Sequence, residues 1–491
     1  MTQPVRAEMY IGGEWVAPQS GQFEDVINPA TEKAFAKAPV GTVQDVSQAI
    51  GAAREAFDHG PWPRMSVRER VAVLGRLLDE LQRRKAEIVG VIVREAGATQ
   101  MLASALQFDI PMKHARRLLE DALLITNGFS PLEISPSMDG RKIVGVSTTV
   151  YDPIGVVAAI TPYNFPFFLN IVKLCHALPM GNTTVLKPSP MTPLEAVVIA
   201  EAAHAVGVPP GVINVITGDI EAGTLLTSDP RVDMVTFTGS DKVGSAIMAQ
   251  GAPTLKKMHL ELGGKSALIV RSDADLKQLL PSAMMFTTHA GQGCALTTRH
   301  LVHNSLRPAY VEMLAQALKS IKIGDTADAT VQMGPLIRDT ARRRSEHYVE
   351  VALQEGARLA SGGRRPDHMS SGYYFEPTLF DLVDNKSRIA QEEVFGPIAV
   401  VIGFDTDEEA IAMSNHSDFG LSGAICSRDA GRAYEMALQL RTGGITINGG
   451  PGTMLSGAPF GGYKRSGLGR EYGREALLEF CQTKSISFQA A

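Results

Sequence analysis

The sequence contains few cysteines, and their spacing excludes the common structural uses of this residue. Only four occur among 491 residues, at Cys175, Cys294, Cys426 and Cys481, and no two of them form a CxxC pair. A disulfide framework and a zinc site are therefore not expected, and no other metal site is predicted. Unpaired thiols suit a reducing compartment such as the cytoplasm.

Long apolar runs and long runs of one charge are also missing. No uninterrupted apolar stretch reaches the roughly 18 residues that a membrane span needs. The opening stretch, MTQPVRAEMYIGGEW, lacks the apolar core of a signal peptide. The formal net charge is −5, which argues against a nucleic-acid surface or a polybasic membrane anchor. We expect a soluble, cytoplasmic protein that binds neither nucleic acid nor membrane.

The chain does contain an alternating pattern of strands and helices. It is longer than the roughly 250–300 residues at which single cores stop growing, so at least two packed units are expected. Short β-branched runs alternate with helical segments between residues 143 and 250, and a second such pattern runs from about 265 to 465. This alternation predicts parallel sheets covered by helices, an α/β fold. The first pattern predicts strands at 155–160, 183–187, 211–216 and 233–237 and a helix at 194–206.

Other segments have clear local signals. Thr42 is a predicted helix N-cap, and Ser66 with Glu69 has the spacing of a capping box, so a helix is expected after each. YIGGEWV near the start predicts a hairpin. Residues 140–152 and 484–490 alternate apolar and polar side chains as exposed strands do. Because exposed strand edges commonly pair with another subunit, these segments predict an oligomer.

Cys294 lies in a segment poorly suited to a packed core. AGQGCALTTR (290–299) places it after Gly291, Gln292 and Gly293, where the backbone is expected to bend so that a reactant can reach the sulfur. A free thiol with a pKa near 8.5 is only a few per cent thiolate at pH 7, yet that fraction is strongly nucleophilic. Cys294 is a candidate nucleophile, with an inert packing cysteine as the alternative.

Glu261 and Asn164 are a candidate base and a candidate amide donor. Glu261 stands between Leu260 and Leu262, so in an extended segment its carboxylate faces away from both leucines. Partial burial would raise its pKa and make it a better base near neutrality. Asn164, in TPYNFPF, follows a predicted strand and offers N–H donors to a developing oxyanion. The alternatives are a solvent-facing strand glutamate and a turn asparagine bonded to its own backbone.

A dinucleotide site is indicated at the ends of two predicted strands. DMVTFTGSDKVGSAI predicts a strand, a glycine turn and a helix start, with Gly239, Ser240 and Gly244 where a backbone could approach phosphate. Lys187 ends an earlier strand. Ligands of open α/β sheets bind beyond the carboxyl ends of the strands, where both features lie. Taken singly, each could also be an ordinary turn or a solvated lysine.

Nine ordered motifs make nearly the whole chain resemble the aldehyde dehydrogenase superfamily. They are NPATE (28–32), TPYNFPF (161–167), VLKPSP (185–190), PPGVINVITG (209–218), FTGS (237–240), LELGGK (260–265), GQGC (291–294), EEVFGP (392–397) and PFGGYKRSGLGRE (459–471).

The resemblance implies a variant Rossmann cofactor domain, an α/β catalytic domain and a β-strand oligomerisation arm. It implies a dinucleotide-binding domain at 1–122 and 146–258, a catalytic domain at 259–465 and oligomerisation segments at 123–145 and 478–491. Members of this superfamily are usually dimers or tetramers, so a homodimer or homotetramer is expected.

The resemblance also implies an activity and a set of site residues. The expected reaction is oxidation of an aldehyde to the carboxylic acid with NAD(P)+, through a cysteine thiohemiacetal and a thioester. The implied catalytic residues are the nucleophile Cys294, the base Glu261, the oxyanion donor Asn164 and a second glutamate of a proton relay, Glu471. The implied cofactor contacts are Thr161, Pro162, Lys187, Ser189, Gly239, Ser240, Gly263, Glu393 and Phe395.

Two positions depart from the superfamily pattern. Pro190 stands where a glutamate often binds the adenosine ribose, which removes a repulsion against a 2′-phosphate and a bond to the 2′-OH. We expect NAD as the cofactor, with NADP as one that the site could also accept. His289 stands where asparagine is common. It predicts either a Cys–His dyad or simple packing, and Glu261 already fills the role of the base.

Aromatic and small residues near the cysteine predict an apolar tunnel for an aliphatic, terpenoid or aromatic aldehyde. The predicted lining residues are Phe165, Phe168, Val172, Gly293, Ala295 and Phe460. Three other functions compete with this one. A CoA-acylating semialdehyde dehydrogenase usually lacks the base glutamate, a cofactor-free thiol hydrolase makes no use of Lys187 or Glu393, and a non-catalytic dinucleotide-binding protein needs no catalytic residues.

Overall fold

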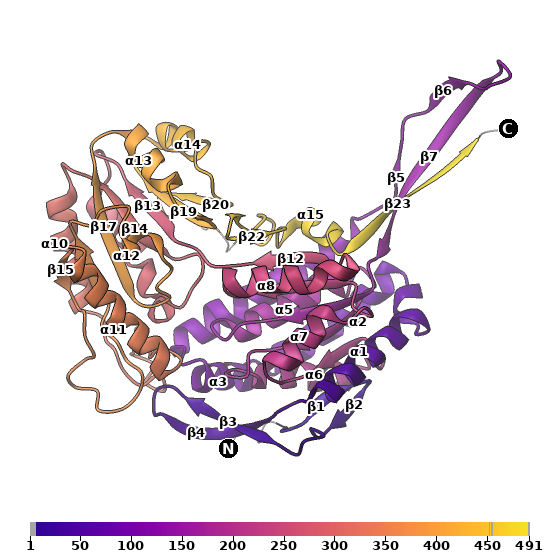
Figure 1. The fold of residues 1–491 in the computed structure, drawn as a ribbon, viewed down its shortest axis with the longest axis horizontal. Helices are drawn as coiled ribbons and strands as arrows, with labels where there is room; N and C mark the ends of the chain where they lie inside the picture. The colour runs from indigo at the N-terminus through magenta and orange to yellow at the C-terminus, as the bar shows by residue number, and fades with distance from the viewer. Residues whose placement is uncertain (1–5, 451, 453–454, 490–491) are drawn as a thin grey trace.

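The computed structural model describes residues 6–450, 452 and 455–489. The outermost parts of the predicted end segments, residues 1–5 and 490–491, and positions 451 and 453–454 within the predicted catalytic domain lie outside the described residues. The described chain forms two α/β units side by side and a narrow β-sheet that projects away from them (Figure 1).

The first unit is built on an eight-stranded sheet with the order β2-β1-β10-β9-β8-β11-β12-β22. Its five central strands, β10, β9, β8, β11 and β12, are parallel, as the alternating pattern predicts. The strands are β1 (Met9–Ile11), β2 (Glu14–Val16), β8 (Val156–Ile160), β9 (Thr183–Lys187), β10 (Ile213–Val215), β11 (Met234–Thr238), β12 (Lys257–Glu261) and β22 (Gly467–Leu468). A separate hairpin pairs β3 (Phe23–Asn28) with β4 (Lys33–Pro39).

Helices of the first unit begin where the sequence signals predict. Thr42 accepts a hydrogen bond from the Asp45 amide at the start of α1, and Ser66 and Glu69 form the predicted capping box at the start of α2. The hairpin in YIGGEWV is confirmed as β1–β2. The helices are α1 (Val43–Asp58), α2 (Val67–Arg83), α3 (Lys85–Glu95), α4 (Ile110–Leu123), α5 (Pro166–Ala177), α6 (Leu194–Ala205), α7 (Ile220–Ser228) and α8 (Asp241–Gly251).

The second unit has a seven-stranded sheet with the order β15-β16-β17-β14-β13-β19-β20. Its strands are β13 (Ser266–Val270), β14 (Thr297–His303), β15 (Arg358–Ser361), β16 (Thr378–Asp381), β17 (Ile398–Phe404), β19 (Ser422–Cys426) and β20 (Gly444–Ile447). Its helices are α9 (Leu276–Ala283), α10 (Arg307–Lys319), α11 (Asp339–Gln354), α12 (Arg388–Gln391), α13 (Asp407–Asn415) and α14 (Ala430–Ala437). Two further short strands, β18 (Phe419–Gly420) and β21 (Tyr463–Lys464), form a separate antiparallel pair.

The projecting sheet is made from two distant parts of the chain. β23 (Cys481–Gln489) pairs along its whole length with β7 (Lys142–Pro153), which also pairs with β5 (Gly128–Phe129) and β6 (Glu133–Pro136). Both strands predicted from alternation are therefore confirmed, although β7 is mostly half-buried. The helix α15 (Gly473–Leu478) leads into β23. This arm exposes large apolar side chains, namely Phe129, Leu132, Ile134, Ile486 and Phe488.

Several predicted site residues lie at the ends of strands. Those of the first unit follow or end β8, β9, β11 and β12, while Cys294 precedes β14 of the second unit. Within the described part of the chain, no helix combines the length and the apolar character that crossing a bilayer requires.

Candidate active site

The backbone before Cys294 bends sharply, as the glycine-rich segment predicts. His289, Ala290 and Gly291 have φ values of 50°, 53° and 77°, which is the left-handed region. A Cβ on Gly291 would lie 2.1 Å from the Gly396 carbonyl, so glycine is required at that close approach. The bend leaves Cys294 partly exposed at the junction of the two units.

The thiol of Cys294 is held in its neutral form by its surroundings. Burial of the sulfur raises the pKa of this thiol to about 12, and the negative charges of Glu393 and Glu261 act in the same direction. The few per cent of thiolate expected for a free cysteine therefore overestimates the thiolate fraction of Cys294 in this protein. A nucleophilic role requires a group that removes the proton.

Asn164 is tied directly to the cysteine segment. Its side-chain amide donates a hydrogen bond of 2.9 Å to the backbone carbonyl of Gln292, two residues before Cys294. Gln292 is itself fixed, because its side chain donates to the carbonyl of His289 at 3.0 Å and accepts from the amide of Ile337 at 2.9 Å. An amide nitrogen carries two hydrogens, so Asn164 retains one donor after bonding Gln292.

Glu261 ends β12 and faces the same junction. It is only 2% exposed, and neither of its carboxylate oxygens has a hydrogen-bond partner among the described residues. A Cβ on Gly264, three residues later, would lie 2.6 Å from the Cys294 carbonyl oxygen, so the chain after β12 packs directly against the cysteine. Burial, followed by the charge of Glu471, raises the pKa of Glu261 well above its usual range.

Glu471 forms a buried ion pair with Lys173. Lys173 Nζ lies 3.3 Å from Glu471 Oε1, and both side chains are almost completely shielded from solvent. Burial alone would raise the pKa of Glu471, but Lys173 and the nearby histidines outweigh it, and the pKa is lowered. The backbone of Glu471 pairs with that of Phe460, which holds the two residues side by side.

The predicted phosphate and ribose contacts lie at the carboxyl ends of β9 and β11. Ser240 caps α8 by accepting from the Val243 amide, and a Cβ on Gly239 would lie 2.2 Å from the Phe237 ring. The ammonium of Lys187 is mostly buried, and this burial lowers its pKa to about 8. A capped helix start and a shielded cation at the carboxyl ends of two strands of one sheet fit the phosphates and ribose of a dinucleotide.

Glu393 and Phe395 belong to the second unit and contact residues that follow β12 and β8. Glu393 Oε1 accepts a 2.9 Å bond from the Gly264 amide, and a Cβ on Gly263 would lie 2.3 Å from its other oxygen. Burial raises the pKa of Glu393 to about 7. The Phe395 ring meets the Tyr163 ring edge to face at 6.1 Å. The second carboxylate oxygen of Glu393, beside Gly263, is suited to accept a hydrogen bond from a ribose hydroxyl.

The remaining predicted cofactor contacts surround Lys187. The Thr161 amide donates to the Lys187 carbonyl at 3.1 Å, and its hydroxyl donates to Asn170 at 2.6 Å. Pro162 follows Thr161 and is partly exposed, while Ser189 bonds the Met191 amide. These residues lie just after the carboxyl ends of the central strands β8 and β9.

Two of the predicted tunnel residues, Phe165 and Phe168, form a partly exposed aromatic pair. The Phe165 ring packs edge to face against Phe168 at 6.4 Å and against His289 at 5.6 Å. Phe168 and Phe460 are half-buried against the core of the first unit, whereas Val172 is completely buried in that core. Gly293 and Ala295, beside the nucleophile, are partly exposed.

His289 packs against this aromatic pair. Burial lowers the pKa of its imidazole to about 4, so the ring is neutral at physiological pH. Its contact with Phe165 favours the packing interpretation over a Cys–His dyad.

Comparison with known proteins places the chain in one family. A model of the aldehyde dehydrogenase family matches residues 15–486. The chain belongs to the aldehyde dehydrogenase family. A protein from Staphylococcus aureus (strain USA300) with the provisional name aldehyde dehydrogenase is 36% identical over 486 residues, or 98% of both chains.

Solved structures of this family have the same fold. A betaine aldehyde dehydrogenase from Staphylococcus aureus in complex with NAD+ is 36% identical, with a TM-score of 0.94 over 98% of this chain and 94% of that chain. An aldehyde dehydrogenase from Mycobacterium tuberculosis complexed with NAD+ is 38% identical, with a TM-score of 0.92 over 98% of both chains. Related staphylococcal structures carry a BME-modified cysteine.

Three residues of this aldehyde dehydrogenase site were not predicted from its sequence. Lys173 stands in an otherwise apolar helix segment, NIVKLCHAL (170–178), where a buried cation needs a partner. That signal could have identified it. Gln292 and Gly264 were not identified because their roles depend on contacts across the junction.

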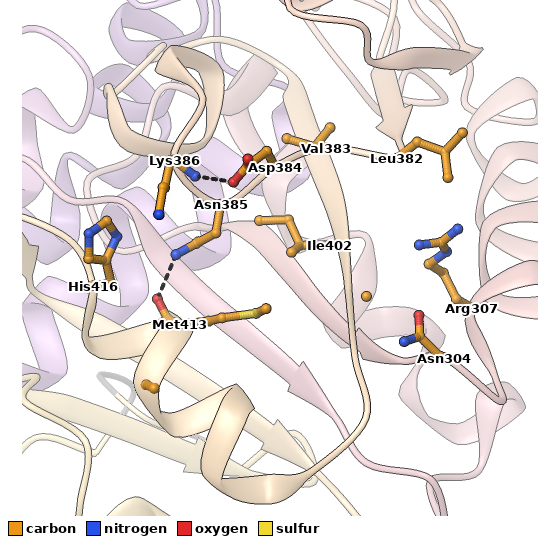
Figure 2. A pocket seen from close by; sticks show the side chains of 12 residues that line it. Asn304, Arg307, Leu382, Val383, Asp384, Asn385, Lys386, Ile402, Met413 and His416 are labelled. Atoms are coloured by element: carbon orange, nitrogen blue, oxygen red, sulfur yellow. Dashed lines mark hydrogen bonds between the residues drawn. The ribbon is translucent and has the colours of Figure 1, made fainter.

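A cavity of about 670 Å³ lies elsewhere in the second unit (Figure 2). It is lined by residues 382–386, by parts of β17 and α13, and by Arg307. Asn385 is fixed on its wall by a bond to the Met413 carbonyl. The cavity shares no residue with the cluster around Cys294, so it is not the candidate active site.

Proposed function

We propose that this aldehyde dehydrogenase oxidises an aldehyde to the carboxylic acid with NAD(P)+, with Cys294 as the nucleophile, Glu261 as the base and Asn164 as the oxyanion donor. The observation that supports this proposal is the contact between the chain segments that carry these three residues. Asn164 bonds the cysteine segment, and the chain that follows Glu261 packs against the Cys294 carbonyl.

In the first half-reaction, Cys294 attacks the aldehyde carbon. Because its resting thiol is neutral, the proton must leave as the carbon–sulfur bond forms. Glu393 and Glu261, the two carboxylates that raise the pKa of this thiol most, have raised pKa values themselves, so either is chemically suited to accept its proton. The free hydrogen of Asn164 and the Cys294 amide then stabilise the oxyanion, typically by about 3–4 kcal/mol per donor.

The cofactor would lie between Lys187 and Glu393. Lys187 and Ser240 would bind its ribose and phosphates, and Glu393 and Phe395 would hold the nicotinamide half. When bound, NAD(P)+ supplies the hydride acceptor that turns the thiohemiacetal into a thioester.

In the second half-reaction, Glu261 activates the water that hydrolyses the thioester. A buried, unpaired carboxylate with a raised pKa is suited to take a proton near neutral pH. This role argues against a CoA-acylating enzyme, in which no water is activated. The proposed contacts of Lys187 and Glu393 argue against a cofactor-free hydrolase.

We propose an apolar aldehyde as the substrate, because Phe165, Phe168 and Phe460 are partly exposed and Phe165 contacts His289, five residues before the cysteine. The staphylococcal relative is named for betaine aldehyde, whose cation could also lie over aromatic rings. Kinetics with a panel of aliphatic, aromatic and terpenoid aldehydes and betaine aldehyde would separate the two substrate classes. A kcat/KM highest for betaine aldehyde would contradict the apolar proposal.

We further propose a homodimer or homotetramer in the cytoplasm, with cofactor, catalytic and oligomerisation parts divided as the resemblance implies. The apolar side chains on the projecting arm support the oligomer, since isolated chains rarely expose a sheet of this kind. Light scattering coupled to size exclusion measures the assembly, and a monomer at micromolar concentration would contradict it.

The activity itself is tested by following nicotinamide absorbance and products with NAD+ and NADP+, with and without CoA. We expect absorbance to rise in step with free carboxylic acid, and CoA to have no effect. An acyl-CoA product, or acid formed without reduced cofactor, would contradict the proposed function.

A further inference from the structure

The backbone carbonyl of Asn164 is held by a side chain from a distant part of the first unit. Gln107 Nε2 donates a hydrogen bond of 3.2 Å to this carbonyl oxygen, although the two residues are 57 positions apart in the chain. Both residues are buried. Because Asn164 is the proposed oxyanion donor, a bond to its backbone affects where that donor lies.

Gln107 belongs to a π-helical segment, η2 (Leu102–Asp109), which packs against α5. At its end the amide of Ile110 bonds the carbonyl of Ala105, five residues earlier. π-helical turns are rare and are found frequently at functional sites. Because a π-helix has more residues per turn than an α-helix, adjacent side chains diverge less around its axis. Gln107 and its neighbour Phe108 can therefore both reach the chain that begins α5.

Gln107 and Phe108 contact the same short turn of that chain. Gln107 bonds Asn164, and the Phe108 ring stacks on the Phe167 ring, with centroids 5.1 Å apart and planes 13° apart. Both rings are completely buried. One hydrogen bond and one ring contact therefore fix the turn at residues 164–167 against η2.

The other side of this turn is fixed by the cysteine segment. The side-chain amide of Asn164 donates to the Gln292 carbonyl at 2.9 Å, and the Phe165 ring packs against His289 at 5.6 Å. The amide group of Asn164 is planar and has two hydrogens on its nitrogen. When one N–H points at Gln292, the direction of the other is set by the position of the Asn164 backbone, which Gln107 holds.

Stability does not account for a glutamine at position 107. Its side chain is completely buried, and its Oε1 atom has no hydrogen-bond partner among the described residues. A buried acceptor without a partner costs folding free energy, whereas a methionine would fill a similar volume without that cost. The feature that glutamine has and methionine lacks is the donor to Asn164.

We propose that Gln107 is a positioning residue of the active site, whose bond to the Asn164 carbonyl aims the free N–H of Asn164 at the oxyanion. This role rests on the proposed function, because it matters only if Asn164 stabilises the oxyanion. Gln107 acts through Asn164 and not on the aldehyde itself. A misplacement of about 1 Å in such a group can cost on the order of a hundredfold in rate.

Gln107→Met tests this role by removing the donor while keeping a similar length and volume. We expect the rate constant of the first-turnover burst of reduced cofactor to fall about tenfold to a hundredfold. The KM for the aldehyde should change by less than about twofold, because the oxyanion contact forms fully only in the transition state. Stopped-flow absorbance over a series of aldehyde concentrations measures both. An unchanged burst would overturn the proposal.

A double-variant cycle separates positioning from a purely structural role. Asn164→Ala alone should lower the burst rate constant about 10²–10³-fold. In that background Gln107→Met should lower it by less than about a further twofold, because the group that it positions is absent. Equal losses in both backgrounds would overturn the proposal. A wild-type enzyme without a burst, or an unchanged burst in Asn164→Ala alone, would instead overturn the proposed function.

Gln107→Glu provides a second test that does not depend on how well the methionine variant folds. Burial raises the pKa of the introduced carboxyl group, so at low pH it is neutral and its O–H can donate to Asn164. The donor is lost as the pH rises and the group ionises. The ratio of the variant's burst rate constant to that of the wild type at the same pH should therefore fall with rising pH. A ratio that is independent of pH would overturn the proposal.

Thr183→Val is the matched control, because it removes another buried donor to a backbone carbonyl. Thr183 begins β9, is completely buried and donates to the Ala53 carbonyl at 2.9 Å. Valine has a similar shape and no donor. We expect the burst rate constant of this variant to stay within about twofold of the wild-type value. A loss as large as that in Gln107→Met would show that the effect is not specific to Gln107, which would overturn the proposal.

Discussion

Glu261 and Glu471 are both fully buried, yet they are in opposite electrostatic states. Glu261 has no hydrogen-bond partner among the described residues, and its pKa is raised. Glu471 lies 3.3 Å from Lys173, and its pKa is lowered. Burial raises the pKa of both carboxyl groups, so the difference between their pKa values comes from the charged residues around each. The comparison teaches that one lysine can keep one carboxylate ionised, and that this anion helps to make its neighbour a base.

Glu261→Gln removes the base and should have the largest effect on turnover. The burst should persist, because the thiol proton can still pass to Glu393, but steady-state turnover should fall about 10²–10⁴-fold. Stopped-flow absorbance measures both phases. Equal loss of burst and steady state would mean that Glu261 is needed before the thioester forms.

Lys173→Met breaks the other side of the comparison by leaving Glu471 buried without its cation. Loss of one member of a buried ion pair typically costs about 3–5 kcal/mol of folding free energy. Chemical denaturation measures this cost. Lys173 also lowers the pKa of Glu261, so its loss should move the acid limb of the kcat–pH profile to higher pH. A stable variant with an unmoved acid limb would contradict the pairing.

Glu471→Gln should shift the acid limb in the opposite direction. The charge of Glu471 raises the pKa of Glu261, so its removal lowers that pKa and extends activity to lower pH. We expect a smaller loss of turnover, about tenfold, because the amide cannot pass on a proton. An acid limb that moves to higher pH would show that the charge of Glu471 does not control Glu261.

Local features of the fold could be predicted from the sequence because they depend on neighbouring residues. The alternation around Glu261 predicted that its carboxylate would face away from Leu260 and Leu262, and Leu260 indeed packs into an apolar core. The helix starts after Thr42 and Ser66 followed from capping chemistry alone.

Contacts between distant residues could not be predicted in the same way. Lys173 and Glu471 are 298 residues apart, and Asn164 is 128 residues from the carbonyl that it bonds. No local pattern encodes such a pairing. The role of Glu471 came only from the family resemblance, and the neutral state of the Cys294 thiol required knowledge of the carboxylates around it.

The central claim is that Cys294 becomes covalently acylated by the aldehyde. Intact-protein mass spectrometry of Glu261→Gln, quenched in acid after mixing with aldehyde and NAD+, tests it most directly. We predict a mass increase of one acyl group per subunit, located on the peptide that contains Cys294 and absent from the Glu261→Gln/Cys294→Ala double variant. An unmodified Cys294 alongside formation of reduced cofactor, or an acyl group on another residue, would contradict it.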